Sequence, residues 1–171
     1  MQTQEYGQLK LSDEEKERET VFGLMIERQH SEPSDKNKES LFLAMKDAFV
    51  YVPMHFAFTA EEMQKLMKTR DVAQVDMNNV KYSPIYYVNQ STGEKILPCF
   101  SRLEEFSEED RKKKIPFGRM KLENLVKIAD TIPEAFDFAF DFHTHLVRMT
   151  LDELMEGLGL SDNSEEEGSE E

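Results

Sequence analysis

The clearest periodic pattern in the chain is an alternation of apolar and polar residues late in the sequence. Phenylalanine occupies every second position from Phe136 to Phe142, and successive side chains of a β-strand point to opposite faces. Residues 135–143 are therefore predicted to form a strand with one apolar face. The residues between the phenylalanines, Asp141 among them, are expected to face solvent.

Other segments are rich in β-branched and aromatic residues, which favours extended structure. Gly93 lies between two of them, where a hairpin turn needs a positive φ. Pro53 interrupts another and predicts an edge strand or a bend. The additional predicted strands are Phe49–Phe58, Ile85–Val88, Ile96–Phe100, Ile115–Met120 and His145–Met149.

Helices are predicted where apolar residues recur every three or four positions behind a capping residue. Three begin with a capping-box pattern: Thr59 with Glu62, Ser101 with Glu104, and Thr150 with Glu153. The predicted helices are Leu41–Asp47, Thr59–Gln74, Ser101–Lys114, Lys121–Ile132 and Thr150–Gly159. Val21–Gln29 also contains few helix-breaking residues, whereas Ser31–Ser40 is expected to be a polar connection.

These elements predict a single folded domain between two polar ends. Residues 1–19 are expected to be a loose polar arm, in which Ser12 could cap a helix start. Residues 20–160 form the domain, and the acidic residues 161–171 are predicted to be disordered. Helices mix with strands and at least one hairpin, so the predicted fold class is α+β, with a mixed, mainly antiparallel sheet and packed helices.

The negative net charge of the chain limits the classes of partner that it can bind. The formal net charge is −14, and residues 161–171 hold six acids and no base, which leaves −8 for residues 1–160. Such a surface repels phosphate backbones and anionic lipid, so we expect no nucleic-acid or membrane binding. The chain has no apolar run long enough for a membrane span and no signal-peptide pattern at its start. One cysteine cannot form an internal disulfide, which fits a reducing, cytoplasmic compartment.

The single cysteine, Cys99, has two interpretations. A nucleophilic thiol needs a lowered pKa, and a helix predicted to begin at Ser101 could supply one. The neighbours Leu97, Pro98 and Phe100 are apolar, however, and free cysteine is among the residues most often buried. The sequence therefore favours a structural cysteine over a catalytic one.

A metal site is the other candidate for chemistry. His143 and His145 form an H-x-H pair, and Asp141 would share a strand face with His143. Imidazoles and carboxylates together can bind zinc. Polar residues opposite the phenylalanine stripe explain the same pattern without a metal. No phosphate-binding glycine loop or nucleophile elbow is present, and we predict neither cofactor nor catalytic residues.

The order of segments nevertheless resembles a known family. "LFLAMKDAFVYVP", "GEKILPCFSRLEEF" and "IPFGRMKLENLVKIAD" look like the N-terminal domain of the SseB (enhanced serine sensitivity protein) family over residues 37–160. The resemblance implies a cytoplasmic bacterial domain, associated in some members with sulfurtransferase or serine-related phenotypes. It carries over no catalytic residues, and Cys99 falls at a variable position. "DFHTH" stands where the family commonly has asparagine–proline.

The leading hypothesis is a non-enzymatic, cytoplasmic interaction or regulatory module that binds a protein partner. One alternative is an immunity or antitoxin-like protein whose acidic face neutralises a basic toxin. Another is a metal- or thiol-dependent enzyme that uses His143, His145 or Cys99. The sequence leaves the partner and the oligomeric state open.

Overall fold

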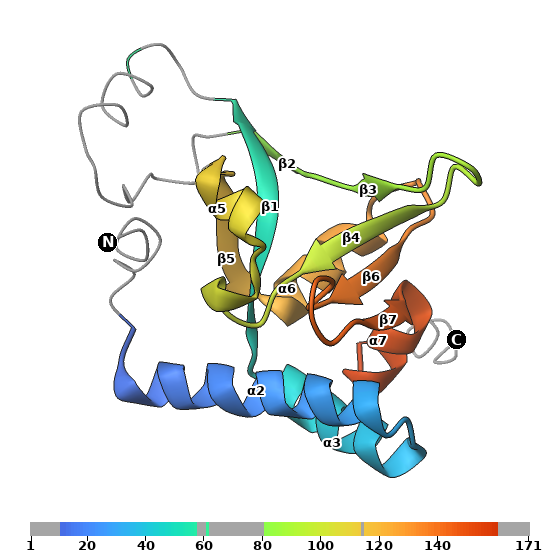
Figure 1. Cartoon of the computed structure of the whole chain (residues 1–171). Coiled ribbons are helices and arrows are strands. Elements are labelled where there is room, and N and C mark those ends of the chain that lie inside the picture. Colours follow the sequence, from blue (N-terminus) through green and yellow to red (C-terminus); the bar gives the residue numbers. More distant parts are fainter. Residues whose placement is uncertain (1–10, 58–60, 62–80, 114, 161–171) are drawn as a thin grey trace, which may run out of the picture.

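Two helices form a layer along one side of the molecule, and the strands lie on one side of this layer (Figure 1). The computed structural model describes residues 11–57, 61, 81–113 and 115–160. The layer consists of α2 (Asp13–Ser31) and α3 (Asp35–Met45), which pack side by side. The C-terminal helix α7 (Leu151–Gly157) contacts α3.

Helix α2 begins where a capping residue permits it. Ser12 accepts a hydrogen bond from the backbone N–H of Glu15, whose own side chain returns to the Ser12 N–H, which completes a capping box. Phe22 and Ile26 bury one face of the helix. The boundary expected at residue 20 thus falls inside α2, and residues 13–19 belong to the folded unit instead of a loose arm.

Helix α3 starts earlier than its apolar residues indicate. The side chain of Ser34 accepts a hydrogen bond from the Asn37 N–H, and the helix runs from Asp35. The prediction of a polar connection through Ser40 was therefore wrong for its second half. A serine cap outweighed the lack of apolar residues, because capping stabilises the first turn whatever the helix buries.

The first sheet has the strand order β2-β1-β5, with β1 (Phe49–Ala57) in the centre. Residues 49–53 of β1 pair with β5 (Phe117–Lys121), and residues 54–57 pair with β2 (Lys81–Pro84). Pro53 lies where β1 changes neighbours. Its missing N–H is tolerated at the end of the β5 pairing, so proline marks this switch and not an edge strand.

The second sheet has the order β3-β4-β6-β7. The predicted hairpin joins β3 (Tyr87–Val88) to β4 (Lys95–Cys99), and Gly93 has a φ of 74° in its turn. Strand β4 runs parallel to β6 (Asp137–Phe140), which is antiparallel to β7 (Val147–Thr150). Two mainly antiparallel sheets with packed helices make a single α+β domain, as the sequence predicts.

Strand β6 is shorter and more buried than the alternation of phenylalanines implies. Phe138, Ala139 and Phe140 are all 0% exposed, because β6 lies between β4 and β7 and is covered on both faces. The chain then turns at Asp141, which has a φ of 48° and is 1% exposed. The prediction that the residues between the phenylalanines face solvent was wrong for Ala139 and Asp141.

The predicted helices have different outcomes. Helix α6 (Leu122–Asp130) is confirmed, and so is the Thr150–Glu153 capping box of α7. A helix capped by Ser101 does not form; instead a 3-10 turn, η1 (Leu103–Glu105), precedes the short helix α5 (Glu108–Lys112), which Ser107 caps. The helix expected at Thr59–Gln74 and the acidic residues 161–171 lie outside the described residues, except for Glu61. None of the described helices combines the length and apolar character of a membrane span.

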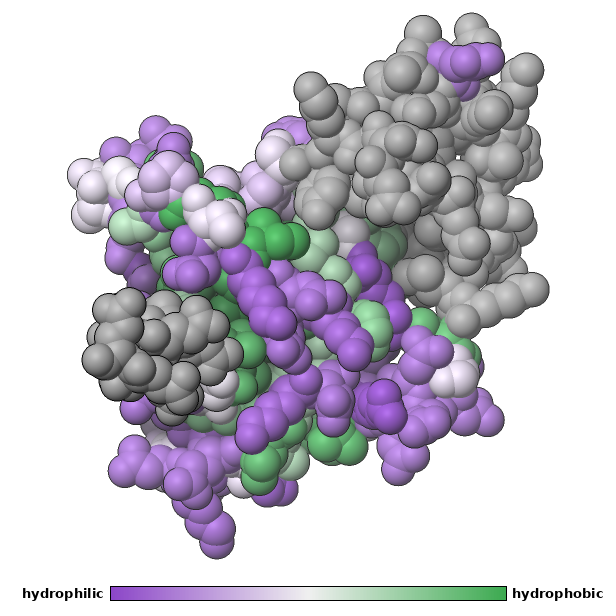
Figure 2. Space-filling view, turned by 180° about the vertical axis from the view of Figure 1, so that it is seen from behind, coloured by the Kyte–Doolittle hydropathy of each residue, from purple (hydrophilic) through white to green (hydrophobic). Residues whose placement is uncertain are grey.

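The main core lies between the helical layer and the strands. Its buried side chains come from α2, α3, β1, β4, α6, β6, β7 and α7, and they include Phe22, Ile26, Leu41, Met45, Val50, Val52, Met54, Leu97, Cys99, Leu122, Leu125, Val126, Phe138, Phe140, Met149 and Leu154. Tyr51 and Phe100 join the two sheets, since each backbone N–H donates to the other's carbonyl at 2.9 Å. The described residues on the face shown in Figure 2 are largely hydrophilic, with hydrophobic patches between them.

Candidate functional site

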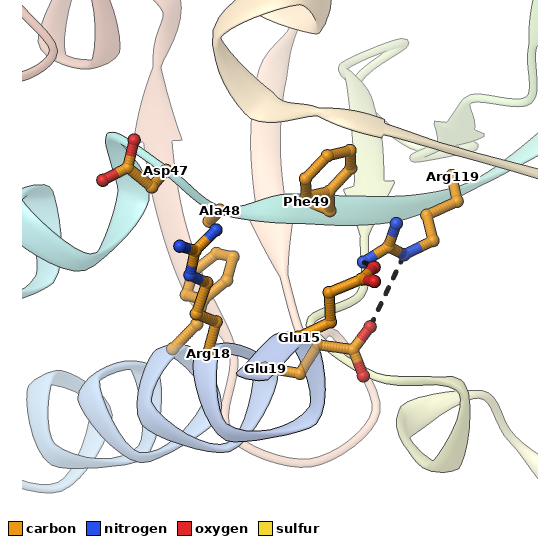
Figure 3. A pocket seen from close by; sticks show the side chains of 8 residues that line it. Glu15, Arg18, Glu19, Asp47, Ala48, Phe49 and Arg119 are labelled. Atoms are coloured by element: carbon orange, nitrogen blue, oxygen red, sulfur yellow. Dashed lines mark ion pairs between the residues drawn. The ribbon is translucent and has the colours of Figure 1, made fainter. Parts of the chain in front are cut away.

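A polar cluster connects the N-terminal half of α2 to the first sheet (Figure 3). Arg119 of β5 forms ion pairs with Glu15 at 3.1 Å and Glu19 at 3.6 Å, both on α2. Its guanidinium lies 4.1 Å from the ring centroid of Phe49, and the Tyr51 hydroxyl donates a short hydrogen bond to Glu19. Burial raises the pKa of Glu19, while the bonds from Tyr51 and Arg119 oppose that rise.

The pocket beside this cluster is too small for a ligand. Its volume is about 10 Å³, which is close to the minimum for one water molecule. Burial, followed by the bond to Glu19, raises the pKa of Tyr51, so its hydroxyl stays protonated and keeps donating. The cluster holds α2 against β1 and β5, so its role is structural.

A second polar cluster joins the turns that follow β4 and β6. Asp141 accepts hydrogen bonds from both the backbone N–H and the hydroxyl of Ser101, each at 2.9 Å. The nearby carboxylate of Glu105 is 8% exposed and accepts bonds from Arg102 and Thr144. Since β4 and β6 are parallel neighbours, this cluster ties their carboxyl ends together.

The environment of Asp141 disfavours its charge. Its pKa is raised from 3.8 to about 6, because the effect of burial, with a smaller contribution from the charge of Glu105, outweighs the bonds from Ser101, which lower the pKa. A carboxyl with such a pKa can serve in catalysis. Here, however, donors from the chain itself engage both oxygen atoms, and the residue is 1% exposed. The geometry therefore supports a structural tie.

The three predicted metal ligands do not converge. Asp141 is bound to Ser101 inside the protein, while the Nε2 atom of His143 lies 3.3 Å from Asp110. The imidazole of His145 lies 4.0 Å from Glu27 on α2. Strand β6 ends before this segment, so the shared strand face on which the site depended does not exist. Among the described residues no group of three ligands could hold a metal ion.

Cys99 is a core residue. It is 0% exposed, and its thiol lies 3.8 Å from the carbonyl oxygen of Leu97. Burial, with a smaller contribution from the charge of Asp141, raises its pKa well above the usual range. A thiol that stays protonated and hidden from solvent is a poor nucleophile. The structure therefore supports the structural interpretation of Cys99.

The outer side of the helical layer has a different character. Val21 and Leu24 on α2 are 43% and 52% exposed, and Leu43 on α3 is 67% exposed. We call these three residues the outer helical face. The opposite sides of the same helices fill the core through residues such as Ile26 and Leu41. In Figure 2, hydrophobic atoms lie among hydrophilic ones at the lower edge, the level of α2 and α3 in Figure 1.

Two open hollows flank Leu43. The first hollow, of about 380 Å³, lies between α2 and α3. Its lining residues are Glu14, Glu17, Arg18, Val21, Leu43, Ala44, Asp47 and Ala48. The second hollow, of about 620 Å³, lies between α3 and α7. Its lining residues are Asp35, Lys38, Glu39, Phe42, Leu43, Lys46, Glu153, Glu156 and Gly157.

The sequence prediction missed this surface, although a signal for it exists. Leu43 is two positions from both Leu41 and Met45, which places it on the opposite side of a helix from those buried residues. Val21 is similarly out of phase with Ile26. By contrast, no local pattern indicates the partners of Arg119, because its acids lie about a hundred positions earlier in the chain.

The comparisons with known proteins are negative. No family model, curated protein or solved structure matches this chain. The resemblance to the SseB family over residues 37–160 therefore stays a prediction.

We predict that Asp141→Asn changes how stability depends on pH. Folding raises the pKa of Asp141 from 3.8 to about 6, so the folded protein binds the proton more tightly and loses stability as pH rises through this interval. Asparagine lacks that titration and tolerates a positive φ. Urea unfolding at pH 4 and pH 7 should show the wild type losing about 2 kcal/mol relative to the variant. A constant gap between the two proteins would contradict the raised pKa.

We also predict that Cys99 resists thiol reagents in the native protein. Because the thiol is 0% exposed, labelling must wait for an opening of the core. The rate of reaction with an aromatic disulfide should therefore rise with added denaturant in proportion to the unfolded fraction. Labelling of the native protein as fast as that of the unfolded chain would restore Cys99 as a candidate nucleophile.

Proposed function

We propose that this protein is a non-enzymatic interaction module that binds a protein partner through the outer helical face. The observation that carries the proposal is the exposure of Val21, Leu24 and Leu43 on one layer. They are three of the six large hydrophobic side chains that are exposed in the described part of the chain. Val21 and Leu43 line the same hollow, and contiguous exposed apolar surface is typical of protein–protein contacts.

The position of these residues supports the same proposal. Burying a fully exposed leucine contributes about 1.5–3 kcal/mol, and a partner that covers Leu43 and Leu24, which are 67% and 52% exposed, gains the corresponding part of that free energy from each. The helices that carry them are fixed from behind, by core residues and by Arg119. A binding surface on rigid elements loses little entropy when it binds.

The chemical groups argue against the enzyme alternative. Cys99 is buried and Asp141 is bound to Ser101, while His143 and His145 lie near different carboxylates. The proposal includes a cytoplasmic location, which the single cysteine supports. The net charge of −14 favours a protein partner over a nucleic acid.

A comparison of two variants tests the proposal. Leu43→Glu places a charge in the outer helical face, whereas Ile128→Glu places one on α6, where Ile128 is 38% exposed and lines neither hollow. Both substitutions should leave the fold intact, which thermal unfolding checks. Quantitative mass spectrometry of proteins that co-purify with each variant should then identify a partner.

The expected partner is retained by the wild type and by Ile128→Glu, and it is reduced at least tenfold with Leu43→Glu. A tenfold loss corresponds to about 1.4 kcal/mol, which is the low end of the value for one leucine. If every co-purifying protein is retained equally by Leu43→Glu and Ile128→Glu, the outer helical face is not the binding surface and the proposal fails.

A further inference from the structure

We propose that the partner presents a positively charged amphipathic helix, which lies across α3 with its apolar residues around Leu43. This inference rests on the proposed function and specifies the chemistry of the occupant. It follows from two features of the surface, the ridge that Leu43 forms between the two hollows and the sign of the charges that line them.

The ridge determines the shape of the occupant. Leu43 lines both hollows, so a partner that covers this side chain must fill space on each side of α3. An amphipathic helix does this with apolar side chains spaced three or four residues apart, which straddle a ridge and descend into the grooves beside it. Val21 and Ala44 in the first hollow and Phe42 in the second provide further apolar contacts.

The first hollow determines the sign of the occupant's charge. Arg18, its only basic lining residue, is paired with Glu14 at 2.9 Å. Glu17 and Asp47 line the same hollow, and the described residues that line it include no second base to balance them. The local charge is therefore negative at the edges of an apolar groove, which complements lysine or arginine on the polar face of a docked helix.

The second hollow has the same character. Lys38 pairs with Glu153 at 3.2 Å, which neutralises one of its two bases. Asp35, Glu39 and Glu156 then outnumber the remaining base, Lys46. Acidic residues thus border Leu43 on both sides. A helix with an acidic polar face would meet repulsion in each hollow, and an uncharged one would leave these carboxylates without new partners.

A pair of model peptides provides the test. One is an amphipathic peptide of leucine and lysine, with leucines at helical spacing, and the other has glutamate in place of every lysine. Fluorescence anisotropy should show that the full-length protein binds the lysine peptide, with an affinity that falls as salt is raised. The glutamate peptide should not bind. Binding of both peptides with similar affinity would overturn the inference.

Variants separate docking from general attraction between opposite charges. Leu43→Glu makes the surface more negative, so nonspecific attraction to the lysine peptide would rise or stay the same. Docking on the ridge predicts an affinity at least tenfold lower for Leu43→Glu and unchanged for Ile128→Glu. Equal affinity for all three proteins would show nonspecific attraction and would overturn the inference.

A second set of variants examines the carboxylates. Glu17→Gln with Asp47→Asn removes two charges from the first hollow, and the control Glu108→Gln with Asp130→Asn removes two exposed charges elsewhere. The first pair of substitutions should lower the affinity for the lysine peptide severalfold more than the control pair does. It should also reduce the dependence of that affinity on salt. An identical effect of both pairs would mean that only the net charge matters, which contradicts docking in the hollow.

The inference and the proposed function can fail separately. A native partner that depends on Leu43, but which the lysine peptide does not displace, would preserve the proposed function and overturn the inference. A lysine peptide that binds at Leu43, in a protein with no native partner dependent on Leu43, would support the chemistry of the surface and contradict the proposed function.

Discussion

The burial of Phe22 and Ile26 beneath the strands is the contact on which the rest of the structure depends. Because these side chains are buried in the core, one face of α2 faces the strands. The opposite face, with Val21 and Leu24, must then point outward. Burying a phenylalanine and an isoleucine contributes several kcal/mol, which is comparable to a large part of the net stability of a domain. The outer helical face is thus a geometric consequence of how the core is filled.

The polar clusters serve the same purpose at the edges of the core. Arg119 holds the first half of α2, and Asp141 with Ser101 ties the ends of two parallel strands. Each cluster contains perturbed acids, a property that active sites share with structural networks. An active site must be reachable by a substrate, and neither cluster is. The pocket beside Arg119 has a volume of about 10 Å³, and Asp141 in the other cluster is 1% exposed. Chemistry needs room for a substrate, and the described clusters lack it.

Local patterns predicted the elements better than the site. The hairpin at Gly93, the helix α6 and the capping box at Thr150 are set by residues within a few positions of one another, so the sequence predicts them. Whether one face of a strand is exposed or buried depends on which distant elements cover it. Strand β6 is a central strand of its sheet, and Ala139 is buried there. Ser101 had the pattern of a helix cap, but a stronger, buried partner forty positions later engaged it.

The central claim is that α2 is part of the folded unit along its whole length, with its outer side free. Amide hydrogen exchange of the free protein, followed by residue, measures this most directly. The account predicts that the amides of residues 17–31 exchange as slowly as those of β4 and β6. Rapid exchange throughout α2, with the strands still protected, would show that the helix detaches from the core, and the outer helical face would then not exist as a defined surface.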